Sequence, residues 1–478
     1  MSLPLPVIDP EVFARYAGLS LPRHVAYPMP TWWSDLDDVA AAEVRRMARE
    51  SLPTRDLSLY IHVPFCERMC RFCACNRTIL RKDSPTRVER VEGYLDAVIG
   101  ELERRSAECA RSRRGGQPVR QIHWGGGTPT YLSLSQIERL HTACIDHFAV
   151  SHDAELSIEV DPRVTTREQL GLLRRLGFNR ISMGVQDFDP IVQKHVNRVQ
   201  PLELVRSITR DARELGFESI NFDLIYGLPY QTLEGVIDTV LHTCDLRPDR
   251  LAFYHYAQIP DRIANQRGLD HGALPDSAAK LAMLTEARRI FRECGYEFIG
   301  LDHFALPSED LARALRDGRI HRSFQGMTTG RELDLIGVGC SAISVFPRRG
   351  YLQNIREPDE YTARSLGGDE TAIRGLELST EDAERQAILM DLYSYGEISP
   401  TRLRERDGVE LDHYLTEAFE AIERLVDDGL VDRTAEGGLR LTDALGRVLM
   451  RNVAAAFDGY LPADAAWSGL RDTFSVSA

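Results

Sequence analysis

The sequence predicts an α/β fold in which six parallel strands and their helices form an incomplete (β/α)6 barrel. Apolar runs rich in Ile, Val, Phe and Tyr alternate with amphipathic, helix-like stretches, the pattern of a parallel sheet. Polar or glycine residues follow the predicted strands, and the carboxyl ends of barrel strands converge on one mouth. An open, doubly wound sheet is the alternative, but it would gather ligand-binding groups at one switch point.

The six predicted strands cover residues 57–63, 120–126, 155–160, 180–185, 219–227 and 250–257. The groups at their carboxyl ends are Gly125–Gly127, Thr128, Glu159, Gln186, Asp223 and Tyr256. Two of the intervening helices begin with a predicted capping box, formed by Ser133 with Gln136 and by Thr165 with Glu168.

A chain of 478 residues is long enough for more than one domain. We expect an N-terminal extension over residues 1–50, the barrel over residues 51–350 and a mainly helical domain over residues 351–478. In this last part, residues 378–396, 411–431 and 443–461 have helical apolar spacing, and residues 431–442 form a predicted hairpin. The order is winged-helix-like, but the surrounding acidic residues favour a cap on the barrel over a DNA-binding module.

The composition is that of an ordinary globular protein, with 43% hydrophobic and 27% charged residues. No apolar run approaches the ~20 residues of a membrane-spanning helix. The N-terminus lacks the basic and apolar regions of a signal peptide, so we expect a cytoplasmic protein. The net charge of −14 argues against a nucleic-acid binder or an anionic-membrane binder, because both need a large basic surface.

Four of the nine cysteines lie within ten residues, at Cys66, Cys70, Cys73 and Cys75. The spacing C-x3-C-x2-C suits an iron–sulfur cluster better than structural zinc, because no second ligand pair follows. Three thiolates leave one iron of a four-iron cluster free to bind another ligand. Cys75 is an alternative fourth ligand, although its spacing from Cys73 is awkward.

The C-x3-C-x2-C motif after the first strand and GGGTPT after the second resemble the radical S-adenosylmethionine (SAM) enzymes. Longer strings resemble the bacterial oxygen-independent coproporphyrinogen III oxidases, among them LYIHVPFCERMCRFCACN, HWGGGTPTYL, GFNRISMGVQDF, NFDLIYGLP and FQGMTT. The resemblance extends in order from about residue 22 to residue 460. It implies a radical SAM barrel that decarboxylates two propionates of coproporphyrinogen III oxidatively to the vinyl groups of protoporphyrinogen IX.

The resemblance also implies a [4Fe–4S] cluster on Cys66, Cys70 and Cys73, and two SAM molecules. The first SAM would contact Tyr60, Gly126, Glu159 and Ile343. The second would contact Phe72, Gly127, Thr128, Gln186, Arg198, Asp223 and Ala257. Tyr60, His62 and Cys75 are further catalytic candidates. The alternative for His62 is a barrel histidine whose hydrogen bonds are satisfied within the protein, and the alternative for Cys75 is an inert thiol.

The resemblance implies a monomer that receives electrons from a low-potential donor of the flavodoxin or ferredoxin type. Some positions depart from the family pattern, namely residues 22–30, Val199, His255 and Gln258. These departures leave two alternatives open. One is a radical SAM paralogue, such as a methyltransferase or cyclopropanase, that modifies another tetrapyrrole or other substrate. The other is a haem-binding chaperone on the same scaffold.

Overall fold

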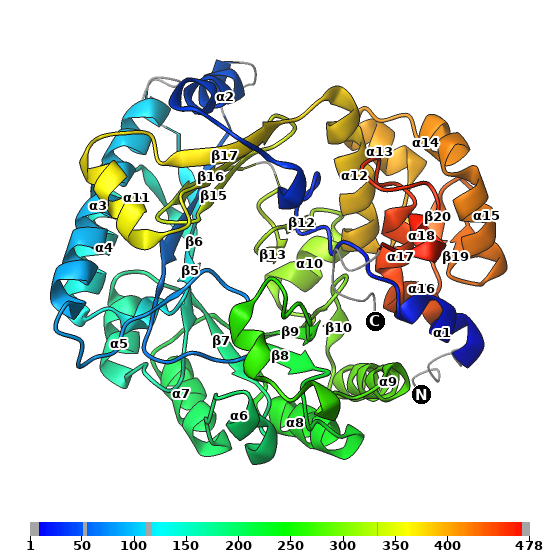
Figure 1. Cartoon of the computed structure of the whole chain (residues 1–478), viewed down its shortest axis with the longest axis horizontal. Helices are drawn as coiled ribbons and strands as arrows, with labels where there is room; N and C mark the ends of the chain where they lie inside the picture. The colour runs from blue at the N-terminus through cyan, green and yellow to red at the C-terminus, as the bar shows by residue number, and fades with distance from the viewer. Residues whose placement is uncertain (1–8, 51–54, 111–116, 332, 471–478) are drawn as a thin grey trace.

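The computed structural model describes residues 9–50, 55–110, 117–331 and 333–470 (Figure 1). Thirteen strands of the described residues form one sheet. In chain order they are β1 (Ser34–Asp35), β2 (Leu57–Val63), β5 (Val119–Gly126), β6 (Val150–Val160), β7 (Arg180–Gln186), β8 (Ser219–Tyr226), β9 (Arg250–His255), β10 (Glu297–Phe298), β11 (His303–Ala305), β14 (Asp334–Val338), β15 (Ile343–Phe346), β16 (Gly350–Asn354) and β17 (Ala372–Glu377).

The prediction of an incomplete α/β barrel is confirmed. Strands β14, β2, β5, β6, β7, β8 and β9 are neighbours in that order and are all parallel. Antiparallel strands extend the sheet on both sides, so that its described edges are β1 and β10. The barrel is therefore a curved sheet with an open side (Figure 1).

Helices of the barrel lie along the outside of the curved sheet in Figure 1. They are α3 (Arg87–Ala110), α4 (Leu134–His147), α5 (Arg167–Arg175), α6 (Pro190–His195), α7 (Leu202–Glu214), α8 (Leu233–Leu246), α9 (Ser277–Glu293) and α11 (Pro358–Leu366). Helix α10 (Asp310–Arg316) lies apart from them, near the middle of the view. The first of the two predicted capping boxes is confirmed, because Ser133 and Gln136 bond reciprocally at the start of α4.

The second predicted capping box was wrong by one residue. Thr166 and Gln169 form it at the start of α5, in place of Thr165 and Glu168. The Thr165 hydroxyl instead donates to the carbonyl of Asp161 at 2.8 Å. Two adjacent threonines offered the same local signal, and the Thr165 hydroxyl is also engaged by a tertiary contact, at 2.8 Å from the Thr130 hydroxyl.

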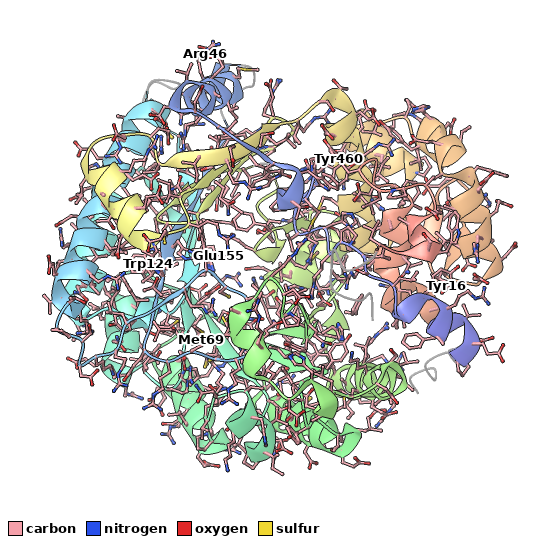
Figure 2. The ribbon with its side chains drawn as sticks, viewed as in Figure 1. Tyr16, Arg46, Met69, Trp124, Glu155 and Tyr460 are labelled. Carbon is pink, nitrogen blue, oxygen red and sulfur yellow. The ribbon has the colours of Figure 1, made fainter. Side chains whose placement is uncertain are left out.

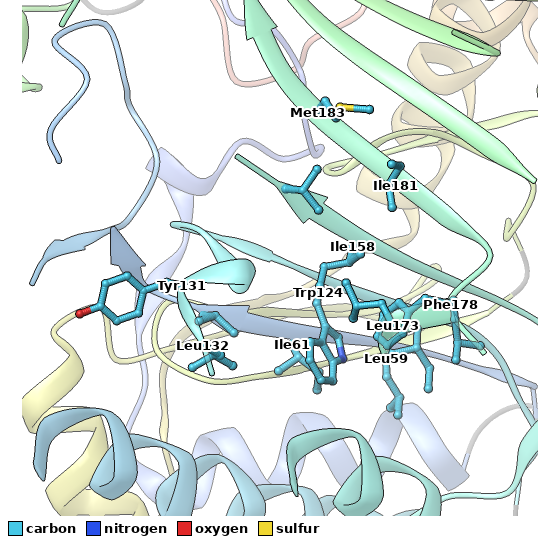
Figure 3. Close-up of a cluster of buried hydrophobic side chains, with 14 of the residues drawn as sticks. Leu59, Ile61, Trp124, Tyr131, Leu132, Ile158, Leu173, Phe178, Ile181 and Met183 are labelled. Carbon is cyan, nitrogen blue, oxygen red and sulfur yellow. The ribbon is translucent and has the colours of Figure 1, made fainter. Parts of the chain in front are cut away.

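The main core lies between the sheet and its outer helices. Trp124 on β5 is fully buried, and its ring meets that of Phe178 edge-on at 5.1 Å between centroids (Figures 2 and 3). Ile61 and Ile158 come from the two strands beside β5 and are also fully buried. Since side chains alternate along a strand, the opposite faces of these strands point into the barrel.

A second core joins the C-terminal helices α12 (Thr380–Tyr395), α13 (Pro400–Asp407), α14 (Asp412–Glu417), α15 (Phe419–Asp427), α16 (Leu445–Val448), α17 (Met450–Ala455) and α18 (Ala465–Ser468). A small sheet accompanies them, with β18 (Glu397–Ile398), β19 (Val431–Arg433) and β20 (Leu439–Leu441). Residues 411–431 and 443–461 each form two short helices rather than one. Helix α13 was missed, although Ser399 caps it, Pro400 begins it and Gly408 ends it in the left-handed conformation.

The N-terminal segment connects the barrel to the C-terminal helices. Helix α1 (Pro10–Ala17) packs into the C-terminal core, and the Tyr16 hydroxyl donates to Asp428 (Figure 2). Helix α2 (Asp38–Glu50) lies against β16 and β17. The predicted division at residue 50 borders on residues 51–54, which are outside the described residues. The division at residue 350 stays a prediction, and the barrel sheet continues beyond it to Glu377.

Within the described residues, none of the helices combines the length and the apolar composition that crossing a membrane requires.

Removing the side chain of Ile158 is expected to lower the free energy of unfolding by about 2–5 kcal/mol, because Ile158→Ala leaves a cavity in the core. The matched control is Ile145→Ala on α4, where the side chain is 41% exposed and a change below about 1 kcal/mol is expected. Urea unfolding followed by circular dichroism measures both variants. Equal losses in the two variants would contradict this account of the core.

Candidate active site

The cysteine loop begins where the first barrel strand ends. Cys66 lies on β3 (Phe65–Cys66), which pairs with β4 (Thr78–Ile79), so residues 67–77 leave the barrel and return beside their starting point. The Cys66 sulfur contacts the Thr128 hydroxyl at 3.3 Å. Cys70 is buried, Cys66 and Cys73 are half-buried, and Cys75 is exposed. The three predicted cluster ligands therefore share one loop at the carboxyl ends of the barrel strands.

Two arginines donate hydrogen bonds to the sulfur of Cys70. The distances are 3.4 Å from Arg163 and 3.5 Å from Arg198. Both guanidinium groups also bind Asp161, at 2.6 and 3.3 Å. Burial would raise the pKa of Asp161, but the charges of Arg198 and Arg163 together lower it to about 2. Two positive charges thus face one carboxylate, and both guanidinium groups also donate to the Cys70 sulfur.

Cys75 interacts with Cys73 instead of standing apart. The Cys75 side chain lowers the pKa of Cys73, although burial opposes the shift. The same contact raises the pKa of Cys75 above its ordinary value. Cys75 is therefore coupled to Cys73, one of the three predicted cluster ligands.

Side-chain amides from two distant segments hold the backbone of the cysteine loop, which Met69 marks in Figure 2. Asn265 donates to the carbonyls of Cys70, Arg71 and Cys73, at 3.1, 2.9 and 3.0 Å. Gln266 donates to the carbonyl of Phe72 at 3.1 Å, and Asn197 donates to that of Met69 at 2.7 Å. Five consecutive carbonyls are bound in this way, and we call these three side chains the amide clamp.

Tyr60 and His62 support the returning end of the loop. Nε2 of His62 lies 2.9 Å from the carbonyl oxygen of Asn76, which can only accept, so this nitrogen carries the proton. Nδ1 then accepts from the Tyr60 hydroxyl at 3.0 Å. Burial lowers the pKa of His62 to about 4, which keeps the ring neutral. Both ring nitrogens therefore have hydrogen-bond partners. This agrees with the alternative interpretation of the sequence, in which His62 is a barrel histidine with satisfied hydrogen bonds.

The glycines after β5 allow close contacts that a side chain would block. Gly126 has a φ of +117°, and a Cβ there would lie 2.6 Å from the His62 ring. A Cβ at Gly127 would lie 2.4 Å from the carbonyl oxygen of Pro64. The Gly126 N–H donates to Glu159 at 3.1 Å, and His123 lies 3.6 Å from the same carboxylate. These contacts keep the pKa of Glu159 below its ordinary value, although burial would raise it.

Asp223 on β8 and Glu159 on β6 both line one cavity of the barrel interior. Burial, and then the charge of Glu159, raise the pKa of Asp223 to about 6. Asn221 and Ser182 donate to its carboxylate at 2.8 and 3.2 Å and oppose the shift. The site therefore holds two carboxylates that stabilise a cationic ligand better than a neutral one.

The remaining predicted residues surround this centre. Gln186 ends β7 with a φ of +68°. Its side-chain amide and the Arg198 guanidinium both approach Gly184 so closely that a side chain at that position would clash with them. Phe72 packs beside Tyr256, and Gln266 bonds the carbonyls of both Phe72 and Ala257. Ile343 lies farther along the sheet, on β15, and packs beside Trp33 and Tyr351. The described contacts do not join Ile343 directly to the other predicted site residues.

Residues 60–242 match the family model of the radical SAM superfamily. The oxygen-independent coproporphyrinogen III oxidase of Salmonella typhimurium is 41% identical, over 94% of each chain. The enzyme of that name from Pseudomonas aeruginosa is 38% identical, over 95% of this chain and 96% of its own. A solved structure of Escherichia coli coproporphyrinogen III oxidase, described as a radical SAM enzyme, superposes with a TM-score of 0.85 at 38% identity, covering 96% of this chain and all of that one.

The chain belongs to the oxygen-independent coproporphyrinogen III oxidase family. The resemblance inferred from the sequence motifs is thereby confirmed, together with the radical SAM fold. Membership of the radical SAM superfamily implies a [4Fe–4S] cluster and SAM as cofactors.

The loop of this family member fits such a cluster. Three sulfurs share one loop, two guanidinium groups donate to one of them, and the buried Nε of Arg198 has no hydrogen-bond partner among the described residues. Within the same residues, no three His, Cys, Asp or Glu side chains converge tightly enough for a single metal ion. A four-iron cluster is larger, so its thiolate ligands stand farther apart than those of one tetrahedral ion.

Sequence reasoning missed the residues that act on the loop from a distance. Arg163 and Asp161 follow the third predicted strand, and their place in the motif IEVDPR was the available signal. Asn265 and Gln266 lie in a short 3-10 turn, Ala264–Gly268, nearly 200 residues after the cysteines. No local pattern connects such a turn to the loop that it holds.

Removing the Asn265 amide is expected to weaken cluster retention, because Asn265→Ala removes one hydrogen bond from each of three loop carbonyls, of which that of Cys70 keeps the Cys73 N–H. Asn265→Asp should be worse than Ala, since a carboxylate would face the same carbonyls. The rate of iron release to a chelator, followed by absorbance, should rise several-fold. Gln258→Ala is the matched control, because that amide contacts the His271 ring on the surface. An Asp variant that retains iron like the unmodified protein would contradict the clamp.

A neutral side chain at position 223 is expected to remove a pH-dependent loss of stability. The pKa of Asp223 is raised from 3.8 to about 6, so the folded state holds a proton that the unfolded chain releases. Its contribution to stability is present below about pH 4 and is lost as the pH rises through 6. Asp223→Asn should therefore gain Tm relative to the unmodified protein between pH 5 and pH 7.5. The exposed Asp238→Asn is the control, and a pH-independent difference for Asp223→Asn would refute the assignment.

Proposed function

We propose that this chain converts coproporphyrinogen III to protoporphyrinogen IX without oxygen, by oxidative decarboxylation of two propionates. Each propionate loses CO2, a hydrogen atom from its β-carbon and one further electron to become a vinyl group. When bound, the cluster and SAM supply the 5′-deoxyadenosyl radical that removes this hydrogen atom. The observation that carries the proposal is the three-cysteine loop with its arginine pair, set beside two carboxylates in the barrel interior.

The cysteines and their neighbours bind and tune the cluster in this proposal. Cys66, Cys70 and Cys73 bind three irons. Arg163 and Arg198 hold negative charge on the Cys70 sulfur by charge-assisted hydrogen bonds. Cys75 is coupled to Cys73, and we assign it an interaction with that sulfur rather than a fourth ligand role. Such hydrogen bonds to sulfur are one of the protein's means of setting a cluster's reduction potential.

Two SAM molecules bind at the strand ends in our proposal. Tyr60, Gly126, Glu159 and Ile343 contact the first, whose ammonium is attracted to Glu159. Phe72, Gly127, Thr128, Gln186, Arg198, Asp223 and Ala257 contact the second. The sulfonium cation of SAM suits the pair Glu159 and Asp223, which line the same cavity. His62 acts through Tyr60, because both of its ring nitrogens are engaged.

Three of the four departures from the family pattern lie away from the barrel cavities, which favours the family's substrate over a paralogue's, whereas residues 25–27 of the fourth departure line a cavity. Val199 is 61% exposed. His255 lies beside Tyr226, on the opposite face of β9 from Tyr254, which lines the barrel interior. Gln258 bonds to His271 on the surface. None of these three side chains lines the barrel cavities described here.

We further propose a monomer that receives electrons from a flavodoxin or ferredoxin type donor. Arg68 and Arg71 are exposed on the cysteine loop, and they suit an acidic carrier that approaches the cluster from that side. A cytoplasmic location is consistent with nine free cysteines, because reducing compartments preserve thiols.

Loss of one cluster ligand is expected to abolish turnover. The reconstituted protein is supplied anaerobically with SAM, a low-potential reductant and coproporphyrinogen III, and the products are followed by chromatography and mass. The unmodified protein should yield protoporphyrinogen and 5′-deoxyadenosine, whereas Cys70→Ser should yield neither. Cys244→Ser on α8 is the matched control and should remain active. Deoxyadenosine without a vinyl product would reject the substrate, and full SAM cleavage by Cys70→Ser would reject the mechanism.

A further inference from the structure

A second cavity lies beside the barrel interior, where the three parts of the chain meet. It has a volume of about 210 Å³. Residues 25–27 of the N-terminal segment, the hairpin of β12 (His321–Ser323) and β13 (Gly326–Thr328), the strands around β14 and helix α12 all contribute to its wall. It shares Ser58, Gln121, Ser323, Gln325 and Thr328 with the cavity that Glu159 and Asp223 line. The two cavities are therefore adjoining parts of one interior space.

The lining of this cavity is strongly basic in a chain with a net charge of −14. Five arginines line it, at positions Arg55, Arg322, Arg331, Arg348 and Arg406, against a single lining carboxylate, Asp407. Asp407 is already shared, because Arg331 and Arg406 both form ion pairs with it, and Arg406 also pairs with Asp391 outside the lining. The excess of arginines over carboxylates in the lining favours an anionic ligand.

Arg322 on β12 is the most informative of these arginines, because it is buried and has unused hydrogen-bond donors. Its side chain is in the cavity wall, yet the residue is only 4% exposed. Among the described residues, its buried Nε and Nη1 atoms have no hydrogen-bond partner. The nearby carboxylate of Asp302 is already bound to Arg23. A buried guanidinium with unused donors is costly, so an acceptor is expected in the working state of the protein.

Aromatic and apolar side chains complete the wall beside Arg322. Its guanidinium carbon lies 5.6 Å from the centroid of the Tyr393 ring. Phe324, two residues along the same hairpin, meets Tyr60 edge-on at 6.0 Å between centroids, which connects this wall to the cysteine site. Phe324 and Met390 also line the cavity. Cations with aromatic surface suit an organic carboxylate better than a small inorganic anion.

We propose that Arg322 binds a carboxylate of the substrate, a propionate that is held while another one reacts. This inference rests on the proposed function. Coproporphyrinogen III has four propionates, of which two keep their carboxylate throughout the reaction. A guanidinium pairs with a carboxylate through two parallel hydrogen bonds along one edge, either Nε with Nη2 or Nη1 with Nη2. The unused Nε and Nη1 of Arg322 belong to different edges, so each of these edges offers a carboxylate a free donor.

Binding of a stable, fluorescent analogue tests the proposal without turnover. The holoenzyme with SAM is titrated anaerobically with coproporphyrin III and, separately, with its uncharged tetramethyl ester. The unmodified protein should bind the acid at least ten-fold more tightly than the ester. Arg322→Met should lose most of this preference and keep its affinity for the ester. Arg322→Lys, which keeps the charge without the fork, should fall between them. Arg210→Met, on the exposed face of α7, is the matched control and should bind like the unmodified protein.

The outcomes separate this site from the proposed function. Acid affinity that is unchanged in Arg322→Met would overturn the inference, and so would an unmodified protein that binds acid and ester equally. Should Arg322→Met not fold by circular dichroism, Arg322→Lys and the acid-to-ester ratio of the unmodified protein decide. A normal acid preference without protoporphyrinogen formation would reject the proposed function and leave the carboxylate site standing. Turnover without any acid preference would do the reverse.

Discussion

The charge balance around Cys70 is the interaction on which the site depends. Arg163, Arg198 and Asp161 lie together at the carboxyl ends of the barrel strands. Two arginines and one carboxylate carry one more positive charge than negative charge. Leaving that charge buried and unpaired would cost several kcal/mol, so the site favours a further negative charge beside the arginines, as a cluster with cysteine ligands would supply. The thiolate is the form that binds iron. The parallel sheet matters here because it delivers both arginines and the cysteine loop to one place.

The backbone of the loop is fixed by a separate device. The amide clamp of Asn197, Asn265 and Gln266 binds five successive carbonyls from outside the loop. A short loop of this kind has no helix or sheet of its own to satisfy these groups. Ligand geometry is thus set before any cluster binds, which is the usual requirement for a precise metal centre.

The sequence allowed the local parts of this design to be predicted. The six strands, the cysteine motif and the box at Ser133 depend on neighbouring residues, and the structure has them close to their predicted bounds. Failures arose where tertiary contacts decided, as at Thr165 and Thr166. The roles of Asn265 and Arg322 could not be predicted, because no neighbouring residue in the sequence indicates the loop or the cavity that each of them contacts. Roles assigned by resemblance, such as that of Ile343, depend on bound SAM and stay predictions.

The mouth of the barrel, where the radical would form, adjoins an interior that suits a large, anionic substrate. Its central claim is that a hydrogen atom passes from a propionate to 5′-deoxyadenosine in this site. The most direct measurement uses coproporphyrinogen III with deuterium at the propionate β-carbons and follows the mass of the deoxyadenosine formed. The account predicts that one deuterium appears in each deoxyadenosine molecule as protoporphyrinogen accumulates. Unlabelled deoxyadenosine alongside a deuterium-depleted vinyl product would contradict it.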